Sequence, residues 1–217
     1  MPDGSLVAAR TAADAALFRN FESLGDNCEF GFVHYHFNPT NTSSLLRWAG
    51  TDVDRLVHGL ETGFAGVGDP AHTRIIWSER EYSLHDPRFF TTHTFHQQQA
   101  PTPEREAELL RRGCAALRLL RRMLLRDIAE GRRIFVHKSA NPQFDEPAMH
   151  RLHAALRRHG PAGLLCVRPP RPGEVAGDVS RLAPGLMLGR IDRFVMAEGP
   201  YDMWHGLCRQ ALALHHG

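Results

Sequence analysis

A cysteine directly after a turn is the first feature of this sequence that could do chemistry. Cys28 follows Gly25-Asp26-Asn27, a run typical of a tight turn, and opens a segment whose apolar residues have helical spacing. Free N–H groups and the dipole at a helix N-terminus stabilise a thiolate, so Cys28 is a candidate nucleophile. The same N–H groups could bind the oxyanion that forms when a thiolate attacks a carbonyl. The alternative is a cysteine that packs beneath the helix cap and does not react.

A thiol nucleophile needs a base, and two histidines in the segment 91–96 are candidates. In a strand, alternate residues share a face, which groups His93 with Phe95 and His96 with Thr94. If Phe95 points into the core, His93 lies on the core side and meets Cys28 across a cleft. His96 then faces solvent.

These residues resemble a bacterial family of unknown substrate that is classed as papain-like cysteine peptidases. The resemblance rests on Ser23-Leu24-Gly25-x-x-Cys28 near the N-terminus and on His-x-Phe at 93–95, and it extends in scattered blocks to the segment 134–136 and beyond. It implies Cys28 as nucleophile, His93 as base and a papain-like sheet flanked by helices. The family usually has Asp after the histidine, where this chain has Thr94. Family members are associated with sugar-transfer or surface-polysaccharide genes, which implies a carbohydrate setting.

Papain-like enzymes also need an Asn or Asp that orients the base. Three residues are candidates: Asp192 in the strand-like segment 190–194, Asn141 after a predicted strand, and Asp145 at a helix start. We rank Asp192 slightly above Asn141, although the flanking arginines at 190 and 193 make a surface ion pair its alternative role. Gly25, Asp26 and Asn27 supply the turn beside the proposed oxyanion site. Trp48, Trp77 and Phe89 are candidate cleft walls, with core packing as the alternative.

Two other interpretations of the same residues are weaker. Gly25-Asp26-Asn27 resembles the Gly-Asp-Ser opening of SGNH hydrolases, but Asn27 cannot act as the nucleophile. The 14 histidines permit a metal-binding interpretation, with His34, His36, the histidines of 91–96 and Cys28 as ligands. Because 28–37 is predicted as a helix, side chains at 34 and 36 diverge. We therefore predict neither a metal nor another cofactor.

The elements that position these residues alternate along the chain. Five helices are predicted at 12–20, 28–37, 103–130, 146–159 and 201–214, and a sixth is capped by Thr51. Strands are predicted at 74–84 and 88–95 on either side of a turn at 85–87, and at 134–136, 164–167 and 186–195. This βαβ alternation favours an α/β (or α+β) fold, compact and in one domain over 1–217. A Pro/Gly-rich loop is predicted at about 168–185, as a lid or a surface loop.

Composition narrows the partners and the setting. The 217 residues include 26 Lys plus Arg and 24 Asp plus Glu, and a net charge of +2 is too small to favour nucleic acid. Apolar runs are too short for a membrane span, and the N-terminus lacks the pattern of a secretory signal. Four scattered cysteines without a Cys-x-x-Cys pair predict free thiols in a reducing, cytoplasmic setting. The oligomeric state is not predicted.

The residues together favour a cysteine-dependent acyl hydrolase or acyltransferase that forms a thioester on Cys28, with His93 as base. We expect a small-molecule, carbohydrate-linked or peptide-linked acyl substrate. A different class of function stays open, a non-catalytic accessory module that serves a glycosyltransferase system. An ordinary thiol at Cys28, without a contact to His93, would favour that module.

Overall fold

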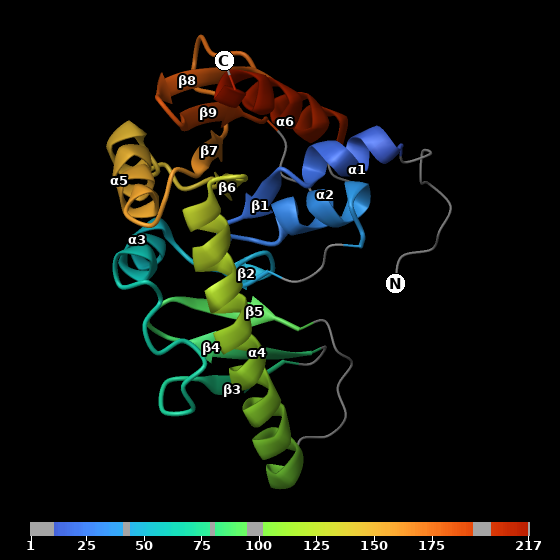
Figure 1. The fold of residues 1–217 in the computed structure, drawn as a ribbon, viewed down its shortest axis with the longest axis vertical. Helices are drawn as coiled ribbons and strands as arrows, with labels where there is room; N and C mark the ends of the chain where they lie inside the picture. Colours follow the sequence, from blue (N-terminus) through green and yellow to red (C-terminus); the bar gives the residue numbers. More distant parts are fainter. Residues whose placement is uncertain (1–10, 41–43, 79–80, 95–101, 193–200, 217) are drawn as a thin grey trace.

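Two β-sheets and six helices make up the described part of this computed structural model, which comprises residues 11–40, 44–78, 81–94, 102–192 and 201–216 (Figure 1). The larger sheet has the order β1-β6-β7-β9-β8 and the smaller one the order β2-β5-β4-β3. The structure confirms the predicted α/β class. The papain-like character of the sheet stays a prediction.

The five-stranded sheet is built from parallel strands with one antiparallel edge. β1 (Phe21–Ser23), β6 (Ile134–Lys138), β7 (Gly163–Arg168) and β9 (Leu186–Arg190) are parallel neighbours, and β8 (Val179–Ala183) pairs antiparallel with β9. Parallel neighbours require crossovers, which explains why helices alternate with strands in the sequence. The segments that follow β1, β6, β7 and β9 therefore gather at one edge of the sheet.

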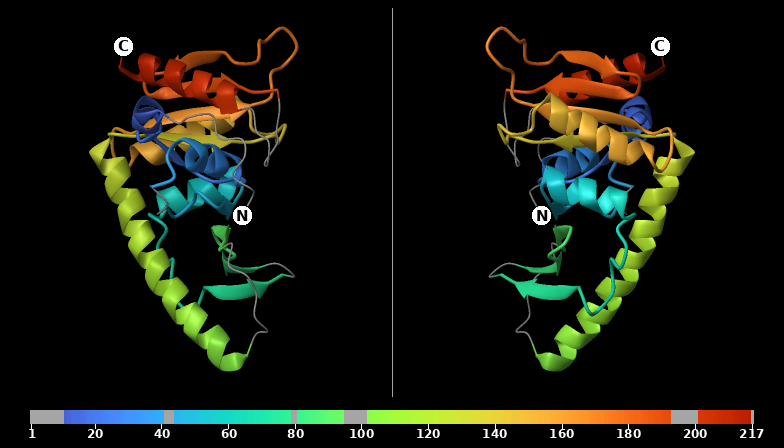
Figure 2. Two further views of the ribbon diagram at one scale, coloured as in Figure 1. Left: turned by 90° about the vertical axis from the view of Figure 1, so that its right-hand side faces the viewer. Right: turned by 90° about the vertical axis from the view of Figure 1, so that its left-hand side faces the viewer.

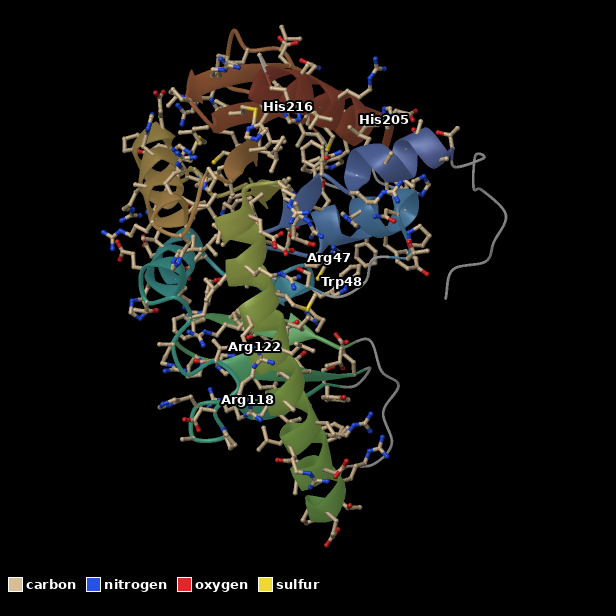
Figure 3. The ribbon with its side chains drawn as sticks, in the orientation of Figure 1. Arg47, Trp48, Arg118, Arg122, His205 and His216 are labelled. Carbon is tan, nitrogen blue, oxygen red and sulfur yellow. The ribbon has the colours of Figure 1, made fainter. Side chains whose placement is uncertain are left out.

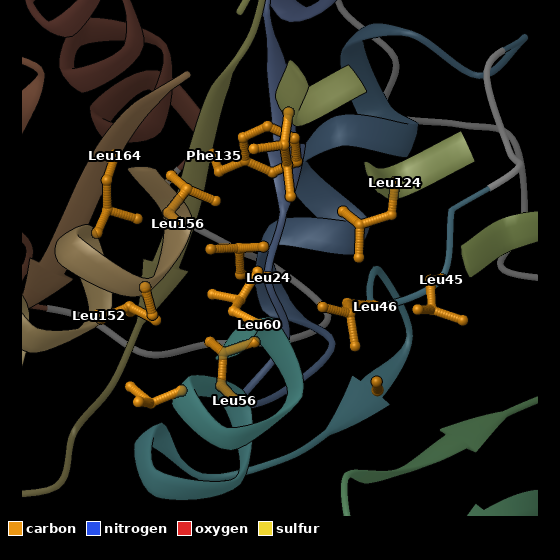
Figure 4. Close-up of a cluster of buried hydrophobic side chains, with 14 of the residues drawn as sticks. Leu24, Leu45, Leu46, Leu56, Leu60, Leu124, Phe135, Leu152, Leu156 and Leu164 are labelled. Atoms are coloured by element: carbon orange, nitrogen blue, oxygen red, sulfur yellow. The ribbon is translucent and has the colours of Figure 1, made fainter. Parts of the chain in front are cut away.

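Helices cover both faces of this sheet. On one face lie α1 (Ala12–Phe18), α2 (Glu29–Phe37) and α6 (Tyr201–His216), which share a buried cluster with strand residues such as Val136 and Leu165. On the other face lie α3 (Val53–Glu61), α5 (Glu146–Arg157) and part of α4 (Pro103–Glu130), which pack around Phe135 and Leu164 (Figure 4). Neighbouring strand residues thus point to opposite sides, as a pleated sheet buried on both faces requires.

The smaller sheet is antiparallel and lies beside α4. Its strands are β2 (Ala49–Gly50), β3 (Arg74–Trp77), β4 (Tyr82–Asp86) and β5 (Phe90–His93). The Trp77 indole N–H donates to Glu106 of α4 at 3.0 Å, and a Cβ on Gly113 would lie 2.7 Å from the Leu84 side chain. Figure 2 shows α4 running along the molecule past both sheets.

The predicted helix at 103–130 is confirmed with its caps. The Thr102 hydroxyl accepts from the Arg105 N–H, Pro103 occupies the first turn, and Gly131 ends the helix with φ of 67°. A side chain at Gly131 would be strained in this left-handed conformation, and its Cβ would meet Pro161 at 2.4 Å.

Several predicted boundaries are wrong for reasons of tertiary structure. Asp52, not Thr51, caps α3, because the Thr51 hydroxyl donates to the Phe89 carbonyl at 2.6 Å. The segment 74–95 contains three strands, and its second turn lies at 87–89. The predicted loop at 168–185 contains strand β8. Its first part is held by Glu174, which accepts from Arg168 at 2.6 and 2.7 Å.

Within the described residues, no helix combines the length and the apolar character needed to cross a membrane.

Candidate active site

Cys28 lies where β1 passes into α2. After Ser23 the chain turns through Gly25 and Asp26, both with left-handed φ angles of 84° and 83°. Glycine adopts this conformation freely, whereas at Asp26 it costs conformational energy of a kind that concentrates at functional sites. A Cβ at Gly25 would approach the Ala49 carbonyl to 3.0 Å, so the turn packs tightly on the segment that leads into β2.

Cys28 is itself the N-cap residue of α2, and its side chain makes no capping hydrogen bond. The Asn27 side-chain oxygen nevertheless accepts from the Glu29 N–H at 2.9 Å, and the Ser23 hydroxyl accepts from the Gly25 N–H at 3.1 Å. Within the described residues, the N–H groups of residues 26, 27 and 28 donate to no acceptor. Three adjacent donors at a helix start suit the predicted oxyanion role.

A buried ion pair holds the first turn of α2 in place. The Glu29 carboxylate pairs with the Lys138 ammonium at the end of β6 and accepts from the Trp204 indole N–H at 2.9 Å. All three side chains are almost completely buried, and burial lowers the pKa of Lys138. An ion pair in such surroundings needs fixed geometry. The helix that carries Cys28 is therefore tied to β6 and to α6.

The thiol of Cys28 is protonated at neutral pH. Burial, with only 9% of the residue exposed, and the charge of Glu81 together raise its pKa to about 11. The expectation of a stabilised thiolate is therefore wrong for the free protein, because desolvation outweighs the helix terminus. Any reaction through this sulfur needs a base that removes the proton during attack.

His93 and Glu81 form a hydrogen-bonded pair on the four-stranded sheet. His93 is the last residue of β5, and its Nδ1 lies 2.5 Å from Glu81 Oε1, just before β4. The imidazole is 41% exposed and the carboxylate 16% exposed, so the pair is partly buried. Holding Nδ1 by a carboxylate directs the other ring nitrogen, Nε2, away from Glu81. Phe95 and His96 lie outside the described residues.

Trp48 contacts both α2, the helix that Cys28 caps, and β5, the strand that ends at His93. Its carbonyl accepts from the His93 N–H at 3.0 Å, and a Cβ on Gly31 of α2 would lie 2.7 Å from its indole ring. Figure 3 shows Trp48 beside Arg47 at the level between α2 and β5. Cys28, His93 and Glu81 thus come from separate elements, and the charge of Glu81 reaches the thiol.

The predicted orienting residues have other surroundings. Asn141 belongs to the turn after β6, where its Oδ1 accepts from the Gln143 N–H at 2.9 Å and its N–H donates to Ser139. Asp145 caps α5 through the Ala148 N–H. Asp192 is exposed after β9, and β6 and β7 lie between β9 and β1, a separation of about 14 Å at the end of the strands.

Glu81 is the residue that sequence reasoning missed. It lies 12 positions before His93, and the pairing of Ser83 with His93 in the β4–β5 hairpin brings it next to the imidazole. This contact could have been predicted from the sequence. In a hairpin over 82–93 that pairs Ser83 with His93, Glu81 lies two positions before Ser83 and is therefore a diagonal neighbour of His93. The merged strand prediction at 74–84 concealed it.

Asp26, two residues before Cys28, is a carboxylate with a perturbed pKa. Burial raises its pKa to about 6, against the lowering effects of the Lys138 charge and of the Ser139 hydroxyl, which lies 3.4 Å from Oδ1. The Asp52 charge contributes to the increase. A carboxyl group that titrates near pH 6 within two residues of a thiol is typical of a functional site.

The histidines of the metal-binding interpretation point to different places. His34 is buried beside Phe18, where burial lowers its pKa to about 4, whereas the His36 ring stacks on Tyr201 at 4.0 Å. Among the residues that the structure describes, no three His, Cys, Asp or Glu side chains gather as metal ligands would. Cys114, Cys166 and Cys208 are free and buried, as expected of small core residues.

The chain was compared with protein-family models, with curated proteins and with solved structures, and none of them matches.

Proposed function

We propose that this protein is a cysteine-dependent acyl hydrolase or acyltransferase in which Cys28, His93 and Glu81 act together. The observation that carries the proposal is the double role of Glu81. Its carboxylate holds Nδ1 of His93 at 2.5 Å, and its charge raises the pKa of Cys28. A nucleophile, a base and a carboxylate that orients the base are the parts of a catalytic triad.

The raised pKa of Cys28 determines the order of events. His93 removes the thiol proton as the sulfur attacks the acyl carbonyl carbon, and the imidazolium that forms is paired with Glu81. This imidazolium compensates the negative charge that otherwise disfavours the thiolate. The carbonyl oxygen becomes an oxyanion, which accepts hydrogen bonds from the backbone N–H groups of residues 26–28.

Collapse of this intermediate expels the leaving group, which takes the proton from His93, and leaves a thioester on Cys28. Water or a second nucleophile then gives its proton to His93 and attacks the thioester, which releases the acyl group and restores the thiol. Small-molecule, carbohydrate-linked and peptide-linked acyl groups all fit this scheme, and a cytoplasmic setting remains part of the proposal.

The test is acylation of Cys28 by phenyl thioacetate, followed by peptide mass mapping. We expect an acetyl group on Cys28 in the native protein and none in Cys28→Ser. His93→Ala and Glu81→Gln should each slow acylation by about 100-fold or more, because general-base catalysis contributes at least that much. The matched control is His85→Gln, since His85 lies on the same sheet and contacts Thr91 instead.

The same assay decides between the orienting candidates. Asp192→Asn and Asn141→Ala should leave the rate within about twofold of the native rate, as surface substitutions outside the machinery do. A large loss in Asp192→Asn with none in Glu81→Gln would assign the role to Asp192. Absence of acylation, with iodoacetamide alkylation unchanged by His93→Ala, would contradict the enzyme and favour the accessory module.

A further inference from the structure

Aromatic side chains continue from Cys28 along one side of α2. Phe32 and Tyr35 follow the cysteine at intervals of four and three residues, which places the three side chains in one stripe of a helix. With a rise of 1.5 Å per residue, the stripe leads about 10 Å away from the sulfur. The opposite side of α2 carries Phe30, Val33 and Phe37, which belong to the buried core.

Trp48 widens this stripe beside Gly31 and Phe32 of α2. Its ring packs edge-on against Phe32, with centroids 5.2 Å apart and planes at 68°. Gly31 permits this arrangement, because a Cβ there would lie 2.7 Å from the indole ring and 2.7 Å from the Arg47 carbonyl. Phe32 and Trp48 are both partly exposed, and Tyr35 is exposed. Gly31 therefore lies where the Trp48 ring contacts the backbone of α2.

The charges around Cys28 restrict what can lie on this stripe. Asp26 precedes the thiol by two residues, and the charge of Glu81 acts on it directly. A carboxylate on the substrate would approach these two groups in partly dehydrated surroundings, where like charges repel more strongly than in water. An uncharged group meets no such barrier and gains from contact with the aromatic rings.

We propose that Phe32, Trp48 and Tyr35 form the acyl-binding subsite of the Cys28 centre and that it takes uncharged acyl groups carrying an aromatic ring or a branched alkyl chain. This inference rests on the proposed function and names the substrate class of that site. The acyl carbonyl lies at the sulfur, and the apolar part extends along α2 toward Tyr35.

The experiment compares alkylation of Cys28 by two reagents with the same reactive carbon, chloroacetamide and N-benzylchloroacetamide. All four cysteines are buried, and peptide mapping reads the rate at Cys28 separately from the rates at the other three. We expect the benzyl reagent to react about 10-fold faster in the native protein, because its ring binds the aromatic stripe first. Chloroacetylglycine, which carries a carboxylate, should react more slowly than chloroacetamide.

Variants locate the effect. Trp48→Ala and Phe32→Ala should each reduce the rate ratio of the two uncharged reagents toward one, and circular dichroism verifies their folding. Two variants are used so that one misfolded protein does not end the test. Leu119→Ala, which removes an exposed apolar side chain from α4, is the matched control and should leave the ratio unchanged.

The outcomes separate the subsite from the catalytic proposal. A ratio near one in the native protein, or a high ratio that survives both aromatic substitutions, overturns the subsite. His93→Ala changes the absolute rates only if the base acts on Cys28, and it leaves the ratio of the two reagents intact. Loss of the catalytic proposal therefore appears as rates insensitive to His93, with the ratio still informative about the aromatic stripe.

Discussion

Replacing Asp26 by Asn should stabilise the protein at neutral pH. Burial raises the pKa of Asp26 from 3.8 to about 6, so the folded state binds this proton more tightly than the unfolded chain does. Stability therefore decreases as the pH rises from about 4 to about 6, and the ionised carboxylate opposes folding above that window. Asn keeps the shape, tolerates the left-handed φ of 83° and carries no charge at any pH.

The size of the effect follows from the shift. A change of one pKa unit corresponds to about 1.36 kcal/mol, so the full shift corresponds to about 3 kcal/mol. Asp26 is partly exposed, and screening by water reduces this to about 1–2 kcal/mol at pH 7.5. The attraction of Lys138 for the carboxylate is already contained in the net shift.

Urea unfolding followed by circular dichroism at pH 7.5, 6, 5 and 4 measures the difference between the two proteins. The advantage of Asp26→Asn should be largest at pH 7.5 and should shrink toward zero at about pH 4. Below that pH, Asp26 is protonated in both the folded and the unfolded state, so it carries no charge in either. Asp54→Asn, at an exposed carboxylate paired with Arg151, is the control and should not stabilise the protein at pH 7.5. A variant less stable than the native protein at pH 7.5, or a difference independent of pH, would refute the reasoning.

Two further predictions concern stability. Lys138→Met should lower the free energy of unfolding in urea by about 3–5 kcal/mol, because it leaves Glu29 buried without its cation. Adding Glu29→Gln should restore most of this free energy. An undiminished loss in the double variant would argue against this pairing. Gly131→Ala should lower the unfolding free energy by about 1–3 kcal/mol, because the residue has a left-handed φ and its Cβ would clash with Pro161. Gly173 also has a left-handed φ but has open space around it, so Gly173→Ala should lower the unfolding free energy by only about 1 kcal/mol. Equal losses at the two glycines, measured by thermal unfolding, would mean that the contact with Pro161 is unimportant.

The sequence predicted those parts of the fold whose signals are local. The α4 helix has its cap, its proline and its terminating glycine within the helix and its flanks, so its bounds match the prediction at 103–130. β1 was missed because three residues carry too little periodicity. Its central residue, Glu22, is moreover a buried acid that pairs with two arginines far along the chain, Arg47 at 2.6 Å and Arg133 at 3.2 Å.

The candidate site divides in the same way. The turn and the helix start around Cys28 follow from local residue types, and so does the presence of a histidine on a strand. The carboxylate at His93 depends on the pairing of two strands, and the pKa of Cys28 depends on burial by distant segments. Neither quantity can be obtained from residue spacing, because both are set by contacts between elements.

The position of α4 makes the proposed reaction centre depend on how the two sheets are joined. This helix of 28 residues, about 42 Å long, carries Arg118 and Arg121, which donate to carbonyls of the 63–68 loop at 2.6 Å. Cys28 follows a strand of the larger sheet, whereas His93 and Glu81 belong to the smaller one. A local opening that releases the smaller sheet would therefore separate base from nucleophile while most of the protein stays folded. Activity would then depend on the contact between the two sheets, and it would be lost under milder conditions than those that unfold the whole protein.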